Sequence, residues 1–258
     1  MPEPNSGSKR IAVLIAIGLI AGAMSGLFGV GGGIIIVPLL LMLGFDARLA
    51  AGTSVAAILP TSIVGGASYA IVGDIDWVIA ALLAVGVIAG AQLGSFILSR
   101  IPKDVVFWAF IGFLILVIVS LWIVIPERGT SVEITLLSGL GLVATGFGTG
   151  ILSGVLGIGG GVVVVPALMF FFGASDLVAK GSSLLMMVPG SISATIGNAI
   201  RKNVDLRAAV LLGITACVGS PLGVYFAHAI SPSVSNILFA ALLIGVAIQL
   251  VVKQLGSR

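Results

Sequence analysis

Two copies of one glycine-rich string are the residues of this chain best suited to bind a ligand. Residues 25–38 read SGLFGVGGGIIIVP, and residues 153–166 read SGVLGIGGGVVVVP, 128 positions later. Glycine tolerates positive φ and lets a ligand or another backbone approach closely. A helix that begins directly after such a break presents unpaired N–H groups and the positive end of its dipole, which together attract anions. The two strings therefore predict a site for a small anion that is built mainly from backbone.

Different glycines of these strings are expected to play different roles. The triple glycines are the substrate-binding candidates, and the preceding glycine and the following proline of each string are expected to shape a break in the helix. The binding candidates are Gly31, Gly32, Gly33, Gly159, Gly160 and Gly161, and the structural candidates are Gly29, Gly157, Pro38 and Pro166. The competing interpretation is close helix packing, to which we assign Gly22, Gly26, Gly150 and Gly154.

Hydroxyl groups follow each string at matching positions. Each pair lies about two helical turns before a proline, Pro60 or Pro189, which is expected to interrupt its segment and to free nearby carbonyl groups. The hydroxyl candidates are Thr53, Ser54, Ser182 and Ser183. Two fates stay open for them, donation to a bound oxyanion or a bond back to their own helix.

Two further polar residues are candidates for the site. Lys180 is the cation expected to be drawn inward, and an ionisable group at membrane depth is a functional hypothesis by default. Its alternative is to extend from the end of a segment toward water. Asn198 occupies the position that Tyr69 holds in the first copy, and its amide needs either a neighbouring helix or the ligand. His228, at the end of a segment, is expected to be interfacial.

Several kinds of chemistry have no residues to support them. No Asp or Glu lies in the middle of a predicted span, so a carboxylate proton relay is not visible. Coupling to H⁺, coupling to Na⁺ through backbone carbonyls, and no coupling all remain open. Cys217 is the only cysteine, which excludes an internal disulfide and a cysteine metal cluster. We find no nucleotide loop and no catalytic triad, so the sequence predicts neither an enzyme nor a cofactor.

The elements that must position these residues are membrane helices. The chain has 258 residues, of which 59% are apolar and only 8% charged, whereas a soluble domain carries about 25% charged residues. Uncharged stretches such as 105–125 are long enough to span a bilayer, and a lipid-exposed backbone must satisfy its hydrogen bonds within a helix. Lys and Arg are scattered at segment ends, so they indicate topology rather than a nucleic-acid surface.

The similarity between the two strings extends over most of the chain. At an offset of 129, Gly52-Thr53-Ser54 matches Gly181-Ser182-Ser183, and residues 73–76 match 202–205. Such a fixed offset is typical of an internal repeat. We predict a tail (1–9), a first repeat (10–125), a linker (126–133) and a second repeat (134–253), with about five helical segments in each repeat.

The two repeats are predicted to lie in the membrane in opposite senses. The connection 73–76 contains no Lys or Arg and is expected outside, whereas its counterpart 201–207 contains three and is expected inside. Lys9, Arg10 and Lys253 place both termini in the cytoplasm. Inverted repeats with broken helices are a recurrent design of secondary transporters, which bind substrate near the midplane. The alternative is a duplication that serves folding alone.

The duplicated pattern resembles one known family. FGxGGGxxxVP, a GTS or GSS segment, a loop of the form Gx[IV]DW and a GxxLG span together resemble the TauE/SafE family of sulfite and organosulfonate exporters. The resemblance covers nearly the whole chain. It implies a permease of the cell inner membrane for small sulfur-containing anions such as sulfite or sulfoacetate. The family motif falls on residues 29–33 with Pro38, on 157–161 with Pro166, and on the two hydroxyl pairs.

The expected function is therefore secondary transport of such an anion by alternating access. Lys180, opposite Ala51, and Asn198, opposite Tyr69, would make the site asymmetric. Two alternatives stay open, a passive anion channel and a non-transporting membrane scaffold whose glycine strings are filled by side chains. The expected partners are the substrate anion, the lipid bilayer, H⁺ or Na⁺ as a coupling ion, and a second copy of the chain in a homo-oligomer.

Overall fold

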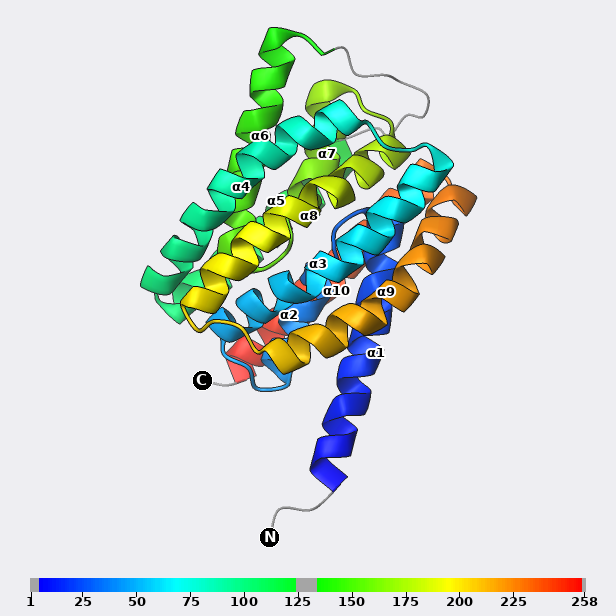
Figure 1. The fold of residues 1–258 in the computed structure, drawn as a ribbon. Helices are drawn as coiled ribbons and strands as arrows, with labels where there is room; N and C mark the ends of the chain where they lie inside the picture. Colours follow the sequence, from blue (N-terminus) through cyan, green and yellow to red (C-terminus); the bar gives the residue numbers. More distant parts are fainter. Residues whose placement is uncertain (1–4, 124–133, 257–258) are drawn as a thin grey trace.

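The chain folds into helices throughout the part that the structure describes. A computed structural model describes residues 5–123 and 134–256, and within them it contains ten α-helices and no strand (Figure 1). The helices are α1 (Asn5–Phe28), α2 (Gly33–Met42), α3 (Ala47–Val72), α4 (Trp77–Arg100), α5 (Lys103–Ile123), α6 (Leu136–Leu156), α7 (Gly161–Phe172), α8 (Asp176–Ile200), α9 (Leu206–Ala229) and α10 (Pro232–Gly256). The predicted linker 126–133 and the first four residues of the predicted tail lie outside the described residues.

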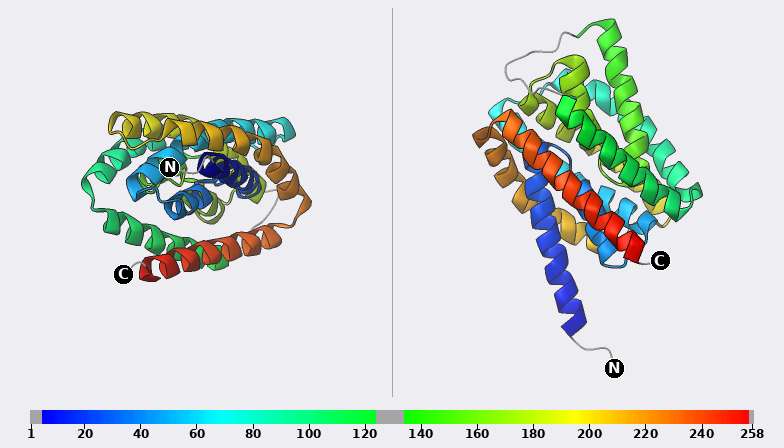
Figure 2. Two further views of the ribbon diagram at one scale, coloured as in Figure 1. Left: turned by 90° about the horizontal axis from the view of Figure 1, so that it is seen from below. Right: turned by 180° about the vertical axis from the view of Figure 1, so that it is seen from behind.

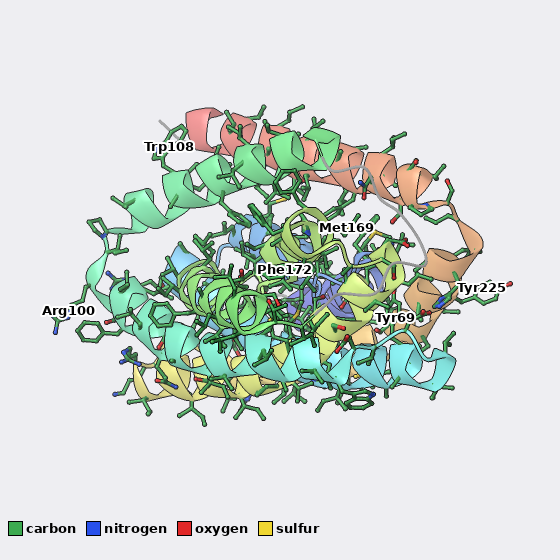
Figure 3. All side chains as sticks on the ribbon, turned by 90° about the horizontal axis from the view of Figure 1, so that it is seen from above. Tyr69, Arg100, Trp108, Met169, Phe172 and Tyr225 are labelled. Atoms are coloured by element: carbon green, nitrogen blue, oxygen red, sulfur yellow. The ribbon has the colours of Figure 1, made fainter. Side chains whose placement is uncertain are left out.

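The helices have the length and composition of membrane spans. Seven are long and apolar enough to cross a bilayer, and shorter apolar stretches lie at Gly33–Met42, Phe107–Val119 and Gly161–Phe172. Large side chains such as Tyr225, 70% exposed, point away from the body, whereas Met169 and Phe172 lie within it (Figure 3). An apolar exterior of this kind is stable in lipid and not in water. The prediction of an all-helical polytopic membrane protein is confirmed at this level.

Two long helix pairs are held together by glycine. Helix α1 packs along α9, and α4 packs along α6. A Cβ atom added to Gly22 of α1 would overlap the Ala216 carbonyl of α9, and one added to Gly150 of α6 would lie 2.5 Å from the Val87 carbonyl of α4. Small residues let helix backbones approach closely where lipid supplies no hydrophobic driving force between helices. The packing role predicted for Gly22 and Gly150 is confirmed, as it is for Gly26 and Gly154.

Helices α3 and α8 lie against each other in opposite directions between these pairs. The backbone of Gly52, near the start of α3, contacts Asn198 near the end of α8 and Asn203 in the connection that follows it. Gly181, near the start of α8, contacts Tyr69 at the end of α3. Helices α5 and α10 lie side by side over one face of the molecule (Figure 2). The short helices α2 and α7 contact α3 and α8, respectively, and are thereby held inside the body.

The prolines of the long central helices do not have the predicted effect. Pro60 and Pro189 were expected to interrupt their segments, but α3 and α8 each continue through the proline as one helix. Proline removes one backbone bond and opens the helix locally without ending it when neighbouring helices hold the segment in place. One such contact is visible at Gly213 of α9, whose added Cβ would lie 2.6 Å from Pro60 Cγ.

Glycine packing between α4 and α6 gives the first testable prediction. Gly150→Leu places a side chain against the Val87 carbonyl and should lower the free energy of unfolding by about 3 kcal/mol, the upper range for overpacking. Gly148→Leu on the same helix is the matched control, because no atom lies within 4 Å of its added Cβ. Thermal unfolding in detergent compares the two variants, and equal losses would contradict the assigned contact.

Candidate functional site

Both glycine strings break the helices that lead into them. Helix α1 ends at Phe28 and α2 begins at Gly33, while α6 ends at Leu156 and α7 begins at Gly161. We call residues 29–32 the first break and 157–160 the second break. Three glycines of each break adopt the left-handed conformation that other residues rarely tolerate. These are Gly29 (φ 70°), Gly31 (75°), Gly32 (76°), Gly157 (73°), Gly159 (82°) and Gly160 (91°).

At each break the chain turns back on itself. A Cβ atom on Gly32 would lie 2.7 Å from the carbonyl oxygen of Ala21, which is more than one turn before the end of α1. A Cβ atom on Gly160 would lie 2.5 Å from Thr149 Cγ2 of α6. The short helices therefore run back beside the long ones, and α1–α2 and α6–α7 form two broken helical hairpins.

The two breaks meet in the interior. A Cβ atom on Gly33 would lie 2.6 Å from the Gly157 carbonyl oxygen, and one on Gly161 would overlap the Gly29 carbonyl. Residues more than 120 positions apart thus lie backbone to backbone, at a distance that only glycine permits. Ile34 and Val162, the second residues of the short helices, are fully buried.

The short helices begin with N–H groups that no side chain caps. Their N-cap residues are Gly32 and Gly160, neither of which offers a side-chain acceptor. The first intrahelical bonds of α2 run from Ile35 N and Ile36 N to the Gly32 carbonyl, so the preceding N–H groups of the helix have no acceptor within it. Two positive helix ends therefore lie close together in a buried region, an arrangement that attracts negative charge.

Two apolar side chains fill the space between the breaks. Met187 Sδ would lie 2.6 Å from a Cβ atom on Gly31, and Ile58 Cδ1 would lie 2.8 Å from one on Gly159. Met187 comes from α8 and Ile58 from α3. The sequence did not indicate either residue, because apolar residues are common in every span. Since methionine has three rotatable bonds and adapts easily, Met187 is the readily movable part of this closure.

Two of the hydroxyl candidates, Ser54 and Ser183, contact the breaks, and Ser183 also makes the predicted bond back to its own helix. Ser54 Oγ donates a hydrogen bond to the Gly157 carbonyl oxygen at 2.8 Å, and Ser183 Oγ lies 2.5 Å from the Gly29 carbonyl oxygen as its donor. Each serine thus donates a hydrogen bond to the break that belongs to the other half of the chain. Ser183 also contacts the Lys180 carbonyl of its own helix at 2.9 Å.

The hydroxyls of Thr53 and Ser182 form hydrogen bonds to the connections between helices instead. Thr53 Oγ1 accepts from the Asp205 N–H at 2.9 Å, and Ser182 Oγ accepts from the Asp76 N–H at 3.0 Å. Both side chains are fully buried. They therefore fix the loops before α9 and α4 and are not directed at the breaks.

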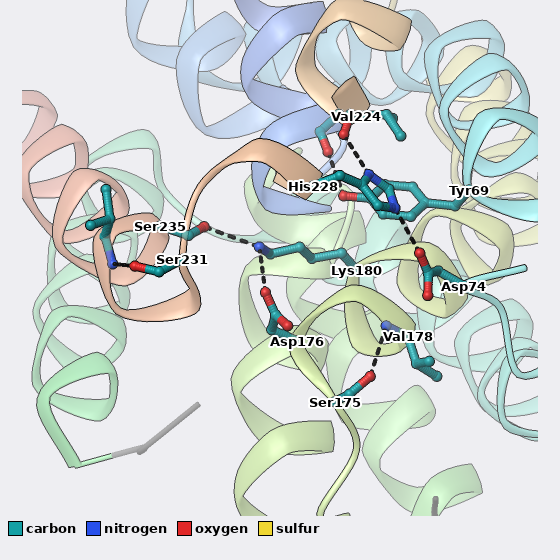
Figure 4. A network of polar contacts seen from close by, with 12 residues as sticks. Tyr69, Asp74, Ser175, Asp176, Val178, Lys180, Val224, His228, Ser231 and Ser235 are labelled. Carbon is teal, nitrogen blue, oxygen red and sulfur yellow. Dashed lines mark hydrogen bonds and ion pairs between the residues drawn. The ribbon is translucent and has the colours of Figure 1, made fainter. Parts of the chain in front are cut away.

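Lys180 is buried and paired. Its side chain is 4% exposed, and Nζ lies 3.3 Å from Asp176 Oδ2 and 3.0 Å from Ser235 Oγ (Figure 4). Its backbone abuts the first break, because a Cβ atom on Gly29 would lie 2.6 Å from Lys180 Cα. Lys180 also lines a small pocket, together with Phe28, Val165, Pro166, Met169, Ser235, Asn236 and Phe239. Lys180 thus joins a pocket wall to the first break.

Asp176 is a buried charged residue that the sequence analysis did not single out. It is the first residue of α8 and is 2% exposed. The spacing of four residues between Asp176 and Lys180 places the two on one helix face and was the available signal.

Asn198 is not brought to the breaks. It lies eleven residues after Met187 on α8, about 16 Å along the helix at 1.5 Å per residue. Its Nδ2 donates to the Ala194 carbonyl of the same helix, and its Oδ1 accepts no hydrogen bond within the described residues. Tyr69, its counterpart, instead reaches α1, where its hydroxyl donates to the Gly26 carbonyl at 2.8 Å.

The two prolines of the glycine strings lie inside the short helices. Pro38 and Pro166 are each five residues after the first glycine of α2 or α7, and both are buried.

Five buried hydroxyl oxygens in the described residues make no hydrogen bond to protein, those of Ser25, Thr149, Ser191, Thr195 and Ser220. Leaving such a group unpaired costs about 1–3 kcal/mol. Thr149 adjoins Gly160, and Ser25 accepts the Gly29 N–H through its carbonyl. Polar groups that the protein leaves unpaired therefore flank both breaks.

Comparison with known proteins places these observations in a family. The family described as sulfite exporter TauE/SafE matches residues 14–250. The chain is 31% identical to a probable membrane transporter protein of Xylella fastidiosa over 258 residues, which cover 96% of this chain and 98% of that protein. It is 30% identical to the probable membrane transporter protein MJ0441 of Methanocaldococcus jannaschii, with 90% and 92% covered. The probable membrane transporter protein YunE of Bacillus subtilis is 28% identical, with 82% and 86% covered. No solved structure matches the chain.

The buried pair on α8 gives a prediction about stability. Lys180→Met leaves the Asp176 carboxylate buried beside an apolar side chain and should lower the free energy of unfolding by about 3 kcal/mol. The double variant Lys180→Met/Asp176→Leu removes both charges and should recover most of that loss. Thermal unfolding in detergent measures both. A double variant that is as unstable as the single one would show that the charges do not act as a pair.

Proposed function

Because the chain belongs to the TauE/SafE sulfite exporter family, whose members compared above are named membrane transporters, we propose that it exports small sulfur-containing anions. Sulfite, sulfoacetate and other organosulfonates are the substrate class. The anion binds between the two breaks, near the middle of the membrane, and alternating access moves it across. The substrate-binding residues of this proposal are the triple glycines, Ser54 and Ser183, with Lys180 beside the first break.

The observation that carries the proposal is the meeting of two uncapped helix starts. The N–H groups that open α2 and α7 have no side-chain cap, and the two helix starts lie in one buried region. The carbonyl oxygens at the same place, those of Gly29 and Gly157, already accept hydrogen bonds from Ser183 and Ser54. Donors therefore remain available while acceptors are occupied, and a ligand rich in acceptor oxygens, such as a sulfite or sulfonate group, suits that balance.

An inverted repeat explains why the contacts come in pairs. Ser54 holds the second break and Ser183 holds the first, at equivalent positions of residues 10–125 and 134–253. Helix α1 packs on α9 as α6 packs on α4. Together with the opposite charge bias of the connections 73–76 and 201–207, this pairing supports a pseudo-two-fold axis between the breaks. Transporters built in this way bind substrate at that axis.

Alternating access is favoured over a passive channel by the closure between the breaks. Met187 and Ile58 occupy the contact region, so an open pore does not pass through it in this conformation. Displacing these side chains toward one face and then the other exposes the helix starts in turn. The scaffold alternative also fits filled breaks, but it gives no role to the unpaired buried hydroxyls of Ser25 and Thr149.

The location and coupling follow from the same proposal. We place this multi-pass protein in the cell inner membrane with both termini in the cytoplasm, on the loop charges alone. A coupling ion, H⁺ or Na⁺, and assembly into a homo-oligomer also belong to the proposal.

The test is anion flux into proteoliposomes. Purified protein should move sulfite or sulfoacetate faster than sulfate, and a proton or Na⁺ gradient should change the rate if that ion is coupled. If no anion moves faster than it does into empty liposomes, the proposal that the protein transports this substrate class is wrong. Flux of all three at equal rates, without saturation, would favour the channel.

The glycine breaks give a matched pair of variants for this assay. Gly160→Ala forces a Cβ atom into positive φ and against Thr149, so it should reduce flux at least about tenfold, which corresponds to about 1.4 kcal/mol. Gly173→Ala carries the same backbone strain at the other end of α7, where no atom lies within 4 Å, and should retain flux. Equal rates for the two variants in folded protein would disprove the role of the second break.

A further inference from the structure

A histidine at one end of the molecule faces two hydrogen-bond acceptors. His228 Nδ1 lies 2.8 Å from the Val224 carbonyl oxygen, and Nε2 lies 2.7 Å from Asp74 Oδ2 (Figure 4). A carbonyl oxygen and an ionised carboxylate only accept hydrogen bonds, whereas a neutral imidazole has one N–H. The geometry therefore requires one proton more than a neutral histidine beside an ionised aspartate would hold. That proton lies between Nε2 and Oδ2.

The pair is open to exchange with water. His228 is 26% exposed and Asp74 is 25% exposed. The shared proton can therefore exchange with the solution at this face of the molecule. His228 is also the only histidine of the chain, so its imidazole can be observed without interference from another one.

The pair is connected to the first break through Tyr69. The His228 ring lies 5.7 Å from the Tyr69 ring, and the Tyr69 carbonyl accepts the Asp74 N–H at 3.1 Å. Tyr69 is fully buried, and its hydroxyl donates to the carbonyl of Gly26, three residues before the break. Movement of the α3–α4 connection relative to α9 therefore acts on α1 just before the break.

The second repeat has no equivalent of this arrangement. At the offset of 129, His228 corresponds to Ser99, Asp74 to Asn203, and Tyr69 to Asn198. A pair that served only to close helix ends would be useful at both ends of an inverted repeat. Its presence at one end gives the two faces of the molecule different responses to pH.

Titratable groups on the elements packed around this end have other partners. Lys180 and Asp176 of α8 pair with each other, and the Asp76 carboxylate accepts the Val78 and Ile79 N–H groups at the start of α4. Tyr225, on the same helix as His228, points away from the body (Figure 3). The proton of the pair is thus held by His228 and Asp74 together.

We propose that His228 and Asp74 form the proton-binding site that couples transport to a proton gradient. This inference rests on the proposed transport function. A proton from the solution at this face binds between Nε2 and Oδ2 and ties the α3–α4 connection to the end of α9. When the proton returns to solution, the Nε2 lone pair faces the carboxylate, the contact is lost, and Tyr69 with α1 is free to move.

The experiment measures flux of a sulfonate, whose own charge does not change with pH under the conditions of the assay. With a proton gradient, wild-type flux should change by at least about fivefold, the lower end of measured coupling between sites. His228→Gln keeps an amide donor toward Asp74 but binds no proton, so its flux should not respond to the gradient. Asp74→Asn, which leaves an oxygen acceptor, should behave in the same way. A gradient response in His228→Gln equal to that of the wild type would overturn the proposal.

A second measurement does not depend on transport. The contact is complete when the proton is bound, so the advantage in unfolding temperature of the wild type over His228→Gln should be largest at the acidic end of a scan from about pH 5.5 to 8 and should shrink as the pH is raised. If the wild type transports no anion, the proposed function fails while this measurement still tests the pair. A difference in unfolding temperature that is constant over this range would overturn the proton site.

Discussion

The structure depends on one constraint, that backbone groups exposed by a broken helix must find partners inside a membrane protein. Each break of this chain leaves carbonyls at the end of one helix and N–H groups at the start of the next. Ser183 and Ser54 supply donors to the carbonyls of Gly29 and Gly157. No side chain caps the N–H groups of α2 and α7. The carbonyl groups of the breaks therefore have hydrogen-bond donors, whereas the N–H groups have no side-chain acceptor. That imbalance favours an anion.

The remaining helices hold the breaks against each other. Packing between α1 and α9, and between α4 and α6, is set by glycines whose backbones touch the facing carbonyls. Helices α3 and α8 then carry Ser54 and Ser183 across the molecule, each to the break of the other half. Because lipid gives little hydrophobic force between helices, these close contacts and buried hydrogen bonds determine the arrangement.

The features encoded locally in the sequence were predictable, and those made by distant partners were not. Charge content, apolar length and the glycine strings predicted a helical membrane protein, two broken helices and the packing glycines. The bonds from Ser54 to Gly157 and from His228 to Asp74 join residues more than 100 positions apart, so local spacing could not indicate them. Pro60 was predicted wrongly because neighbouring helices hold α3 in one piece. The ion pair between Asp176 and Lys180 was not predicted, because Lys180 was interpreted without regard to the carboxylate four residues before it.

The most direct measurement is a structure determined with selenite, the selenium analogue of sulfite, in which anomalous scattering locates the anion. The account predicts selenium between the first residues of α2 and α7, with the selenite oxygens within hydrogen-bonding distance of the N–H groups of Gly33 and Gly161 and with the Met187 side chain displaced. Selenium bound only beside Lys180, or breaks that remain in contact and filled by Met187 at saturating selenite, would contradict the central claim that the two breaks form one anion site.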